Sequence, residues 1–220
     1  MISLRIQKIA EMVKCGMVVA DIGTDHAFLP ILLIQNGTSE KVYACDIGEG
    51  PLKQAEANIA KEGLQDQIIC VLSDGFEHVP EDTEAAVLAG MGYYTAAKIL
   101  DDAKDRLGAM KQILVEVNRN VKEMRQWISD HHYTIDDEEC VYDKGFYYII
   151  ISFTAKPHEP YTEQQILCGP MLMQKQTETY KAYCRKQTER LGLVIANSKD
   201  PQAKENALRE KNMWEETENA

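Results

Sequence analysis

The chain of 220 residues lacks several features that would assign it to a class at once. Its six cysteines are scattered and form no Cys-x-x-Cys pair, so no zinc or other metal site is expected. Three of them lie in or beside apolar runs, which suits reduced thiols in a cytoplasmic protein. No apolar run reaches membrane-spanning length, and no basic segment followed by a long apolar stretch opens the chain. Neither a membrane helix nor a signal peptide is therefore predicted.

Positive charge is also in short supply, and the shortage is uneven. The formal net charge is −11, and residues 156–220 hold ten basic and ten acidic side chains. Residues 1–155 hold the other 14 basic and 25 acidic side chains and so carry the whole excess. An acidic domain repels phosphate backbones at long range, so nucleic-acid binding would need a local basic patch.

The N-terminal part of the chain alternates between two hydrophobic patterns. Short apolar strands are predicted at 17–21, 41–45, 67–71, 84–89 and 112–117. Helical stretches are predicted at 5–14, 28–36, 50–62, 93–104 and 120–131. Repeated strand–helix units with buried apolar strands indicate an α/β fold with a doubly wound, Rossmann-like parallel sheet.

The end of this region has a different pattern. Residues 133–142 lead into the turn Asp143-Lys144-Gly145, and a strongly β-prone run follows at 146–153. This is a hairpin, so the parallel sheet should end in an antiparallel edge. That arrangement resembles class I methyltransferases, and we expect it to form one domain over residues 1–155.

Residues 156–220 are predicted to form a helical appendage. Thr162 with Gln165 makes a capping box for a short helix that Gly169-Pro170 ends, and Asp200-Pro201 begins another helix. Between them runs a polar-spotted heptad seam of Met173, Thr177, Tyr180, Cys184, Gln187, Leu191 and Val194. An antiparallel helix pair, of coiled-coil type, is expected. The seam could pair within one chain or between two, so the oligomeric state stays open.

Acidic side chains stand at three successive strand ends: Asp21, Asp46 and Asp74. Ligands of parallel α/β sheets bind outside the carboxyl ends of the strands, so these carboxylates should share one site. One can neutralise an ammonium group, a second can accept from the ribose hydroxyls, and a third can accept from an adenine amino group while Gly75 leaves room for the ring. S-adenosyl-L-methionine offers all of these partners, and its sulfonium favours a negative surround.

A nicotinamide cofactor is the weaker alternative. Its binding loop needs three glycines so that the backbone can approach a pyrophosphate, and only Gly23 is present after the first strand. Asp25 and His26 stand in the same loop, and a carboxylate there would repel two phosphates.

The segment 21–30 resembles the first motif of the bacterial tRNA methyltransferases that modify N1 of adenine 22, the TrmK family. Further landmarks occur in the same order: Leu4-Arg5, Glu49-Gly50-Pro51, Ser73-Asp74-Gly75, Ala89-Gly90-Met91-Gly92 and Cys168-Gly169-Pro170. The resemblance spans nearly the whole chain. Two sites that face the target base depart from the family's usual sequence. Tyr93 replaces a second glycine, and Glu116-Val117-Asn118 replaces Gln-Pro-Asn.

This resemblance implies a role for particular residues. The cofactor-binding set is Asp21, Gly23, Thr24, Asp46, Asp74, Gly75, Gly90, Met91 and Gly92. Asp25, His26 and Asn118 are the catalytic candidates, and Tyr93 could stack on the target base. In the appendage, Lys181, Arg185, Lys186 and Arg190 are the candidates for contacts with tRNA phosphates.

Other interpretations remain open from the sequence. The strand-end acids and Asn118 could merely begin helices. Tyr93 and Tyr94 could be packing residues, and the basic face of the appendage helix could be only solvated. The substrate could be another RNA or a small molecule. The chain could also bind the cofactor without turnover, with the appendage binding a partner protein.

Overall fold

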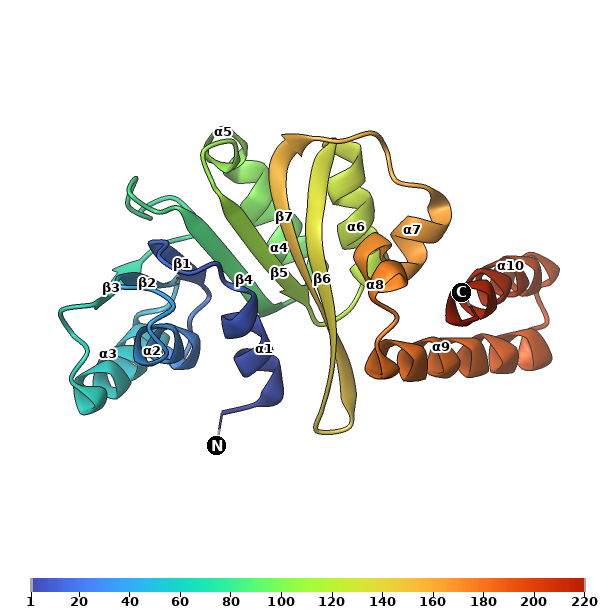
Figure 1. Cartoon of the computed structure of the whole chain (residues 1–220), viewed down its shortest axis with the longest axis horizontal. Coiled ribbons are helices and arrows are strands. Elements are labelled where there is room, and N and C mark those ends of the chain that lie inside the picture. The colour runs from blue at the N-terminus through green and yellow to red at the C-terminus, as the bar shows by residue number, and fades with distance from the viewer. Residues whose placement is uncertain (1, 220) are drawn as a thin grey trace.

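A seven-stranded sheet lies between two layers of helices in the computed structural model, which describes residues 2–219 (Figure 1). The strands are β1 (Val19–Ile22), β2 (Val42–Asp46), β3 (Ile68–Leu72), β4 (Ala85–Met91), β5 (Gln112–Val117), β6 (Tyr133–Asp143) and β7 (Phe146–Pro157). Their order is β3-β2-β1-β4-β5-β7-β6. Strands β1 to β5 pair in parallel, and β7 is antiparallel to both β5 and β6.

The helices cover the two faces unequally. They are α1 (Leu4–Met12), α2 (Phe28–Gln35), α3 (Glu49–Glu62), α4 (Tyr93–Asp102), α5 (Lys104–Leu107), α6 (Val121–Asp130), α7 (Glu163–Cys168), α8 (Pro170–Lys175), α9 (Glu178–Asn197) and α10 (Pro201–Glu218). One core cluster joins the sheet to α1, α2 and α3. The other joins it to α4 to α6 and continues into α7 to α10. Alternate residues of β1 enter opposite clusters, as a sheet buried on both faces requires.

The expected doubly wound sheet with an antiparallel edge is confirmed. Its hairpin reaches further than the neighbouring strand. Glu116 pairs with Ile150, and β5 ends at Val117, while β7 begins four residues before Ile150 at Phe146. The β6–β7 turn therefore projects past the carboxyl edge of the parallel strands, as Figure 1 shows at the bottom of the view.

The C-terminal segment confirms the capping box but contains one more helix than expected. The Thr162 hydroxyl accepts from the Gln165 N–H, and the Gln165 side chain accepts from the Thr162 N–H. Helix α8 begins directly after Gly169, because Pro170 suits a first helical turn.

The expected heptad seam is not one continuous helix. Gln176 has a φ of 47° and ends α8, so Met173 belongs to α8 and Thr177 caps α9. Within α9 the buried side chains are Tyr180, Cys184 and Leu191, and α10 packs along this face. The apolar positions keep a helical spacing across this break, because a single left-handed residue leaves the apolar side chains before and after it on the core side.

No helix within residues 2–219 combines the length and the apolar character that crossing a membrane requires.

Candidate active site

The loop between β1 and α2 lies at the carboxyl edge of the sheet. Gly23, Asp25 and Ala27 all have left-handed backbone conformations, with φ values of 81°, 52° and 57°. Such a conformation is rare for residues that carry a Cβ, and it concentrates at functional sites. The strained turns direct the side chains of Thr24, Asp25 and His26 around one cavity of about 510 Å³, which Asp21, Gly23 and Gly90 also line.

Asp21 is the buried acid of this cavity. Its exposed fraction is 6%, and its Oδ2 accepts from the Thr24 hydroxyl at 2.8 Å. Burial raises the pKa of Asp21 to about 7; the Thr24 hydrogen bond opposes this rise, and the nearby Asp46 carboxylate adds to it. A buried carboxylate with so high a pKa is ready to take a cationic partner, which would restore its ionised form.

Asp46 connects the second strand end to the same loop. Its Oδ1 accepts from the Gly48 N–H at 3.0 Å, and its Oδ2 accepts from the Asp25 N–H at 3.3 Å. These bonds hold a half-buried carboxylate at the end of β2 and fix the Asp25 backbone beside it.

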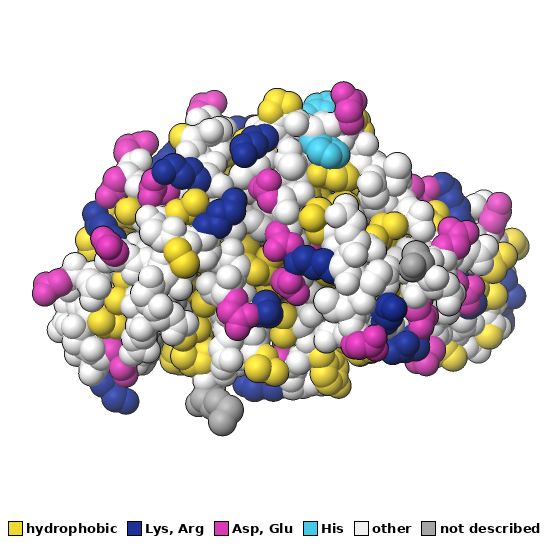
Figure 2. All heavy atoms as spheres, in the orientation of Figure 1, with side chains coloured by type: hydrophobic (Ala, Val, Ile, Leu, Met, Phe, Trp, Pro, Cys, Tyr) yellow, Lys and Arg dark blue, Asp and Glu magenta, His cyan; other side chains and the backbone are white. Residues whose placement is uncertain are grey.

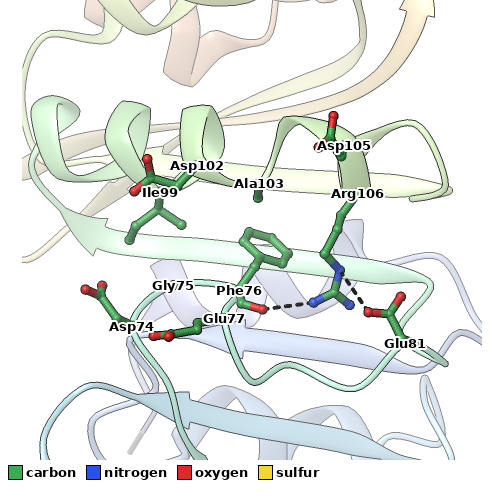
Figure 3. A pocket seen from close by; sticks show the side chains of 10 residues that line it. All are labelled: Asp74, Gly75, Phe76, Glu77, Glu81, Ile99, Asp102, Ala103, Asp105 and Arg106. Atoms are coloured by element: carbon green, nitrogen blue, oxygen red, sulfur yellow. Dashed lines mark hydrogen bonds and ion pairs between the residues drawn. The ribbon is translucent and has the colours of Figure 1, made fainter.

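A second cavity, of about 450 Å³, lies beyond the end of β3 (Figure 3). Asp74, Gly75 and Ile99 stand at one end of it, and Arg106 with Glu81 stands at the other. Gly75 has a φ of 55°, and a Cβ there would lie 2.9 Å from Ile99 Cγ2. Only glycine therefore keeps this slot open. The Arg106 guanidinium donates to the carbonyl oxygens of Phe76 and Val79, so it holds the wall of the cavity.

The structure brings most of the expected cofactor residues to this edge. Asp21, Gly23, Thr24 and Gly90 line the first cavity, and Asp74 and Gly75 line the second. Met91 packs on Gly23, so that a Cβ at position 23 would lie 3.4 Å from the Met91 Cε. Gly92 caps α4.

The three catalytic candidates are not equivalent in position. The His26 Nε2 lies 3.4 Å from the Asp25 Oδ2, and both side chains reach solvent at the mouth of the first cavity. Asn118 lies on the other side of Gly90. Its side-chain amide donates to the Gly90 carbonyl at 2.8 Å, and its backbone N–H donates to the Met91 carbonyl at 3.0 Å.

Two tyrosines begin α4 next to this edge. The rings of Tyr93 and Tyr94 are 5.1 Å apart, and Tyr94 is 80% exposed while Tyr93 is half-buried. The free ring face at this position therefore belongs to Tyr94 rather than to Tyr93, which was the expected stacking residue.

Sequence reasoning also missed an ion pair between the partly exposed Arg5 and the buried Glu116, although both residues lie in stretches that it had noted. Arg5 Nη1 is 2.6 Å from Glu116 Oε2, and that oxygen also accepts from the Gly90 N–H at 3.0 Å. Burial raises the pKa of Glu116, and the Arg5 charge opposes the rise. Arg5 also lines the first cavity and lies 5.3 Å from the Tyr148 ring centre. The glutamate at 116 thus ties α1 to the Gly90 turn.

Arg5→Ala should destabilise the protein by about 3 kcal/mol at pH 8, because the buried Glu116 carboxylate loses its cation. The loss should shrink at pH 5, where protonation relieves the unpaired charge, since removal of Arg5 raises the pKa of Glu116 further. Urea denaturation at both pH values measures this. Adding Glu116→Gln should recover most of the lost stability, and Lys8→Ala, which removes an exposed pair with Glu11, should change it by less than about 1 kcal/mol. A pH-independent loss in Arg5→Ala would contradict the account.

The four basic residues of α9 lie in different environments. Lys186 and Arg190 line a groove of about 610 Å³ that also contains Asn118. Arg185 instead pairs with Glu218 of α10 at 3.1 Å, and Lys181 is half-buried outside the groove. Figure 2 shows acidic and basic side chains interspersed over the visible face, including the α9–α10 end.

The part of the chain that the structure describes contains no cluster of three or more His, Cys, Asp or Glu side chains suited to a metal ion.

Comparison with known protein families identifies the family of this chain. Residues 19–218 match the sequence model of the family described as tRNA (adenine(22)-N(1))-methyltransferase, TrmK. The chain belongs to the TrmK family. The resemblance read from the sequence motifs is thereby confirmed.

Individual TrmK relatives agree with this assignment. The tRNA (adenine(22)-N(1))-methyltransferase of Bacillus subtilis is 32% identical over 151 residues, which are 68% of this chain and 63% of that protein. The alignment thus spans less than two thirds of that relative's length.

Solved structures match over nearly the whole chain. A Streptococcus pneumoniae protein, described as a candidate tRNA (m1A22) methyltransferase and crystallised with S-adenosyl-L-methionine, is 25% identical with a TM-score of 0.89, covering 99% of each chain. TrmK of M. capricolum in complex with S-adenosyl-homocysteine is 27% identical with a TM-score of 0.85, covering 100% of this chain and 98% of that one.

Proposed function

We propose that this protein methylates N1 of adenine 22 in tRNA, with S-adenosyl-L-methionine as the methyl donor. The observation that carries the proposal is the buried Asp21 beside the strained 23–27 loop, together with Asp46 and Asp74 at the two next strand ends. Family membership and the cofactor-bound relatives support the same chemistry.

The residues present fit this cofactor. Asp21, whose pKa burial raises to about 7, suits the ammonium of the methionine part. Asp46, at the end of β2, suits the ribose hydroxyls. The slot that Gly75 keeps open, with Asp74 at its rim, suits the adenine ring and its amino group. When bound there, the cofactor supplies an electrophilic methyl group on a sulfonium.

The chain's own part in the reaction is mainly positioning. Placing the adenine N1 lone pair in line with the methyl group removes most of the entropic barrier, and a small misplacement costs much rate. The adenine ring gains positive charge as its N1 is methylated, and Asp25 at the mouth of the first cavity stabilises that charge. Asp25, paired with His26, accepts the proton that the amino group then loses, and Asn118 positions the base next to Gly90.

The two regions of the chain divide this work. Residues 1–155 form the acidic, cofactor-binding methyltransferase domain. Residues 156–220 hold the RNA through Lys186 and Arg190, which line the groove. Lys181 lies outside the groove, and Arg185 pairs with Glu218 instead. Tyr93 packs at the start of α4 beside Tyr94, whose exposed ring is the one available to stack on the target base.

The test is methyl transfer to unmodified tRNA. Incubation of purified protein with a tRNA transcript and labelled cofactor should yield 1-methyladenosine at position 22, located by a primer-extension stop. A transcript with guanine 22 should take up no label. Label on another base, or none on either transcript, would refute the proposed substrate, and binding of the cofactor without turnover would leave a non-catalytic protein.

A further inference from the structure

The groove beside Asn118 is built from segments that lie far apart in sequence. The β5–α6 loop supplies Asn118 and Arg119, the β6–β7 hairpin supplies Phe146 and Tyr147, and α9 with α10 supplies the opposite wall. Its volume is about 610 Å³, which lies within the range of small-ligand sites.

The groove is basic although the protein is acidic. Its lining cations are Arg119, Lys122, Arg125, Lys186 and Arg190, and its acids are Glu123 and Glu210. Lys122 pairs with Glu210, and Arg125 pairs with Glu138. No ion pair within residues 2–219 joins Arg119, Lys186 or Arg190 to a carboxylate. Within the described residues, three cations and one acid of the groove, Glu123, are therefore unpaired, so positive charge is in local excess in a molecule whose net charge is −11.

The same groove carries aromatic rings. A row of rings, Tyr142, Tyr147, Tyr183 and Trp214, crosses from the hairpin to α10 at centre-to-centre spacings of 4.7, 5.4 and 5.6 Å. The Lys186 ammonium covers the Tyr147 ring at 5.1 Å. Phe146 lies outside this row and is 64% exposed, so its ring face is free for a ligand.

The hairpin tip stands between the two sites. Lys144 reaches the cavity of Asp21 and Asp25, while Phe146, two residues on, reaches the groove. Asn118 borders the groove and donates to Gly90, which lines the cavity. A nucleotide chain with its target base at Asp25 would therefore run past the hairpin into the groove.

We propose that the groove binds the unpaired RNA that flanks the target nucleotide, with one base stacked on Phe146 and phosphates on Arg119, Lys186 and Arg190. The inference rests on the proposed function, and it adds a base-stacking site and a path for the flanking RNA. Cations interleaved with exposed aromatics are the means by which proteins hold single-stranded RNA, since unstacked bases offer their faces and duplex bases do not.

Binding of a labelled, unmodified tRNA transcript, followed by fluorescence anisotropy, tests the stacking. Phe146→Ala should weaken binding about tenfold, and Phe146→Trp should restore it to within about twofold of wild type, because stacking needs only an aromatic face. The matched control is Leu193→Ala, which removes an exposed apolar side chain of α9 outside the groove. The dissociation constant for the cofactor should stay unchanged in all three variants, which also reports folding.

A second measurement locates the stacked base. Transcripts with an abasic residue on either side of position 22 should bind wild-type protein about tenfold more weakly at one of the two sites. Phe146→Ala should lose nothing further on that transcript, because the two deletions remove the same contact. Fully additive losses on both transcripts would overturn the stacking site.

The charged part is read from salt dependence. Arg190→Ala and Lys186→Ala should each lower the slope of log affinity against log salt by about 1, whereas Lys204→Ala, on the exposed side of α10, should not. If only the charge variants weaken binding and Phe146→Ala behaves like Leu193→Ala, the stacking proposal is wrong.

These outcomes are separable from failure of the proposed function, because binding needs no methyl transfer. Suppose that the wild-type protein methylates adenine 22 but Phe146→Ala changes neither its affinity for RNA nor its KM. The proposed function would then stand, and the proposed RNA-binding groove would be wrong. If instead Phe146→Ala weakens RNA binding but the wild-type protein transfers no methyl group, the proposed groove would stand and the proposed function would be wrong.

Discussion

Asp21→Asn should abolish most cofactor binding while making the ligand-free protein more stable at pH 8. The buried carboxylate is the expected partner of the cofactor ammonium, and removing one member of a buried charge pair costs binding about 30-fold or more. Without ligand, the same carboxylate destabilises the folded protein. Its pKa rises from 3.8 to about 7 on burial, so ionising it at pH 8 destabilises the fold, and asparagine avoids this by about 1–3 kcal/mol.

The pH dependence of this effect has a definite sign. Between about pH 4 and pH 7 the folded protein binds the Asp21 proton more tightly than the unfolded chain, so wild-type stability falls as pH rises through that window. The advantage of Asp21→Asn should be complete above pH 7 and shrink toward pH 4. Wild-type affinity for the cofactor should fall below pH 7, because binding must then release the proton.

Calorimetry and thermal denaturation across this range measure both effects. Asp66→Asn, an exposed acid in the loop before β3, is the matched control and should change neither. An Asp21→Asn variant that binds the cofactor normally, or that is less stable than wild type at pH 8, would contradict the assigned role of Asp21.

Glu138→Ala should destabilise the protein by about 3–5 kcal/mol, which lowers Tm by about 6–20 °C for a chain of this size. Arg125 and Glu138 form an ion pair at 2.6 Å with side chains 3% and 0% exposed. Arg125 also donates to the carbonyl of Leu167 at the end of α7, and Glu138 accepts from the N–H of Met171 at the start of α8. The variant leaves the guanidinium buried without its counter-charge.

The Arg125–Glu138 pair thus connects α6 and β6 to the α7–α8 junction, from which α9 and α10 follow. Gly169 passes over the pair with a φ of 94°, and a Cβ there would lie 2.6 Å from Arg125 Nη2. Gly169→Ala should therefore reproduce the loss. The paired change Arg125→Met with Glu138→Met should be far milder than Glu138→Ala, because it removes both charges together. Lys98→Ala, which breaks an exposed pair with Asp102, should cost less than about 0.5 kcal/mol. Equal stability of Glu138→Ala and wild type would show that the Arg125–Glu138 pair does not stabilise the fold.

Local signals in the sequence predicted the elements of the fold well. Strands β1 to β5, the Thr162 capping box and the Asp200-Pro201 helix start follow from hydrophobic period and capping chemistry, which act within a few residues. The expected burial was wrong for β3, which is an edge strand with only Ile68 buried. The break at Gln176 escaped prediction, because a left-handed glutamine carries no compositional signal and apolar spacing continued across it.

The edge at which the acids lie was also predictable, since parallel strands end on the same side of a sheet. Asp21, Asp46 and Asp74 could be placed there from sequence alone for that reason. They do not line one cavity, because Asp21 and Asp74 belong to separate ones. The Arg5–Glu116 pair could not. Its partners are 111 residues apart, and only the packing of α1 against the sheet edge brings them together.

By itself, then, the sequence determined the α/β class, the strand-end acids and the family to which they point, because each depends on local pattern or on a general property of parallel sheets. Tertiary structure alone decided how the basic residues of α9 divide. Lys186 and Arg190 turn into the groove beside Asn118, while Arg185 pairs with Glu218. That division depends on how α9 packs against α10 and the sheet, and no pattern along the chain encodes it.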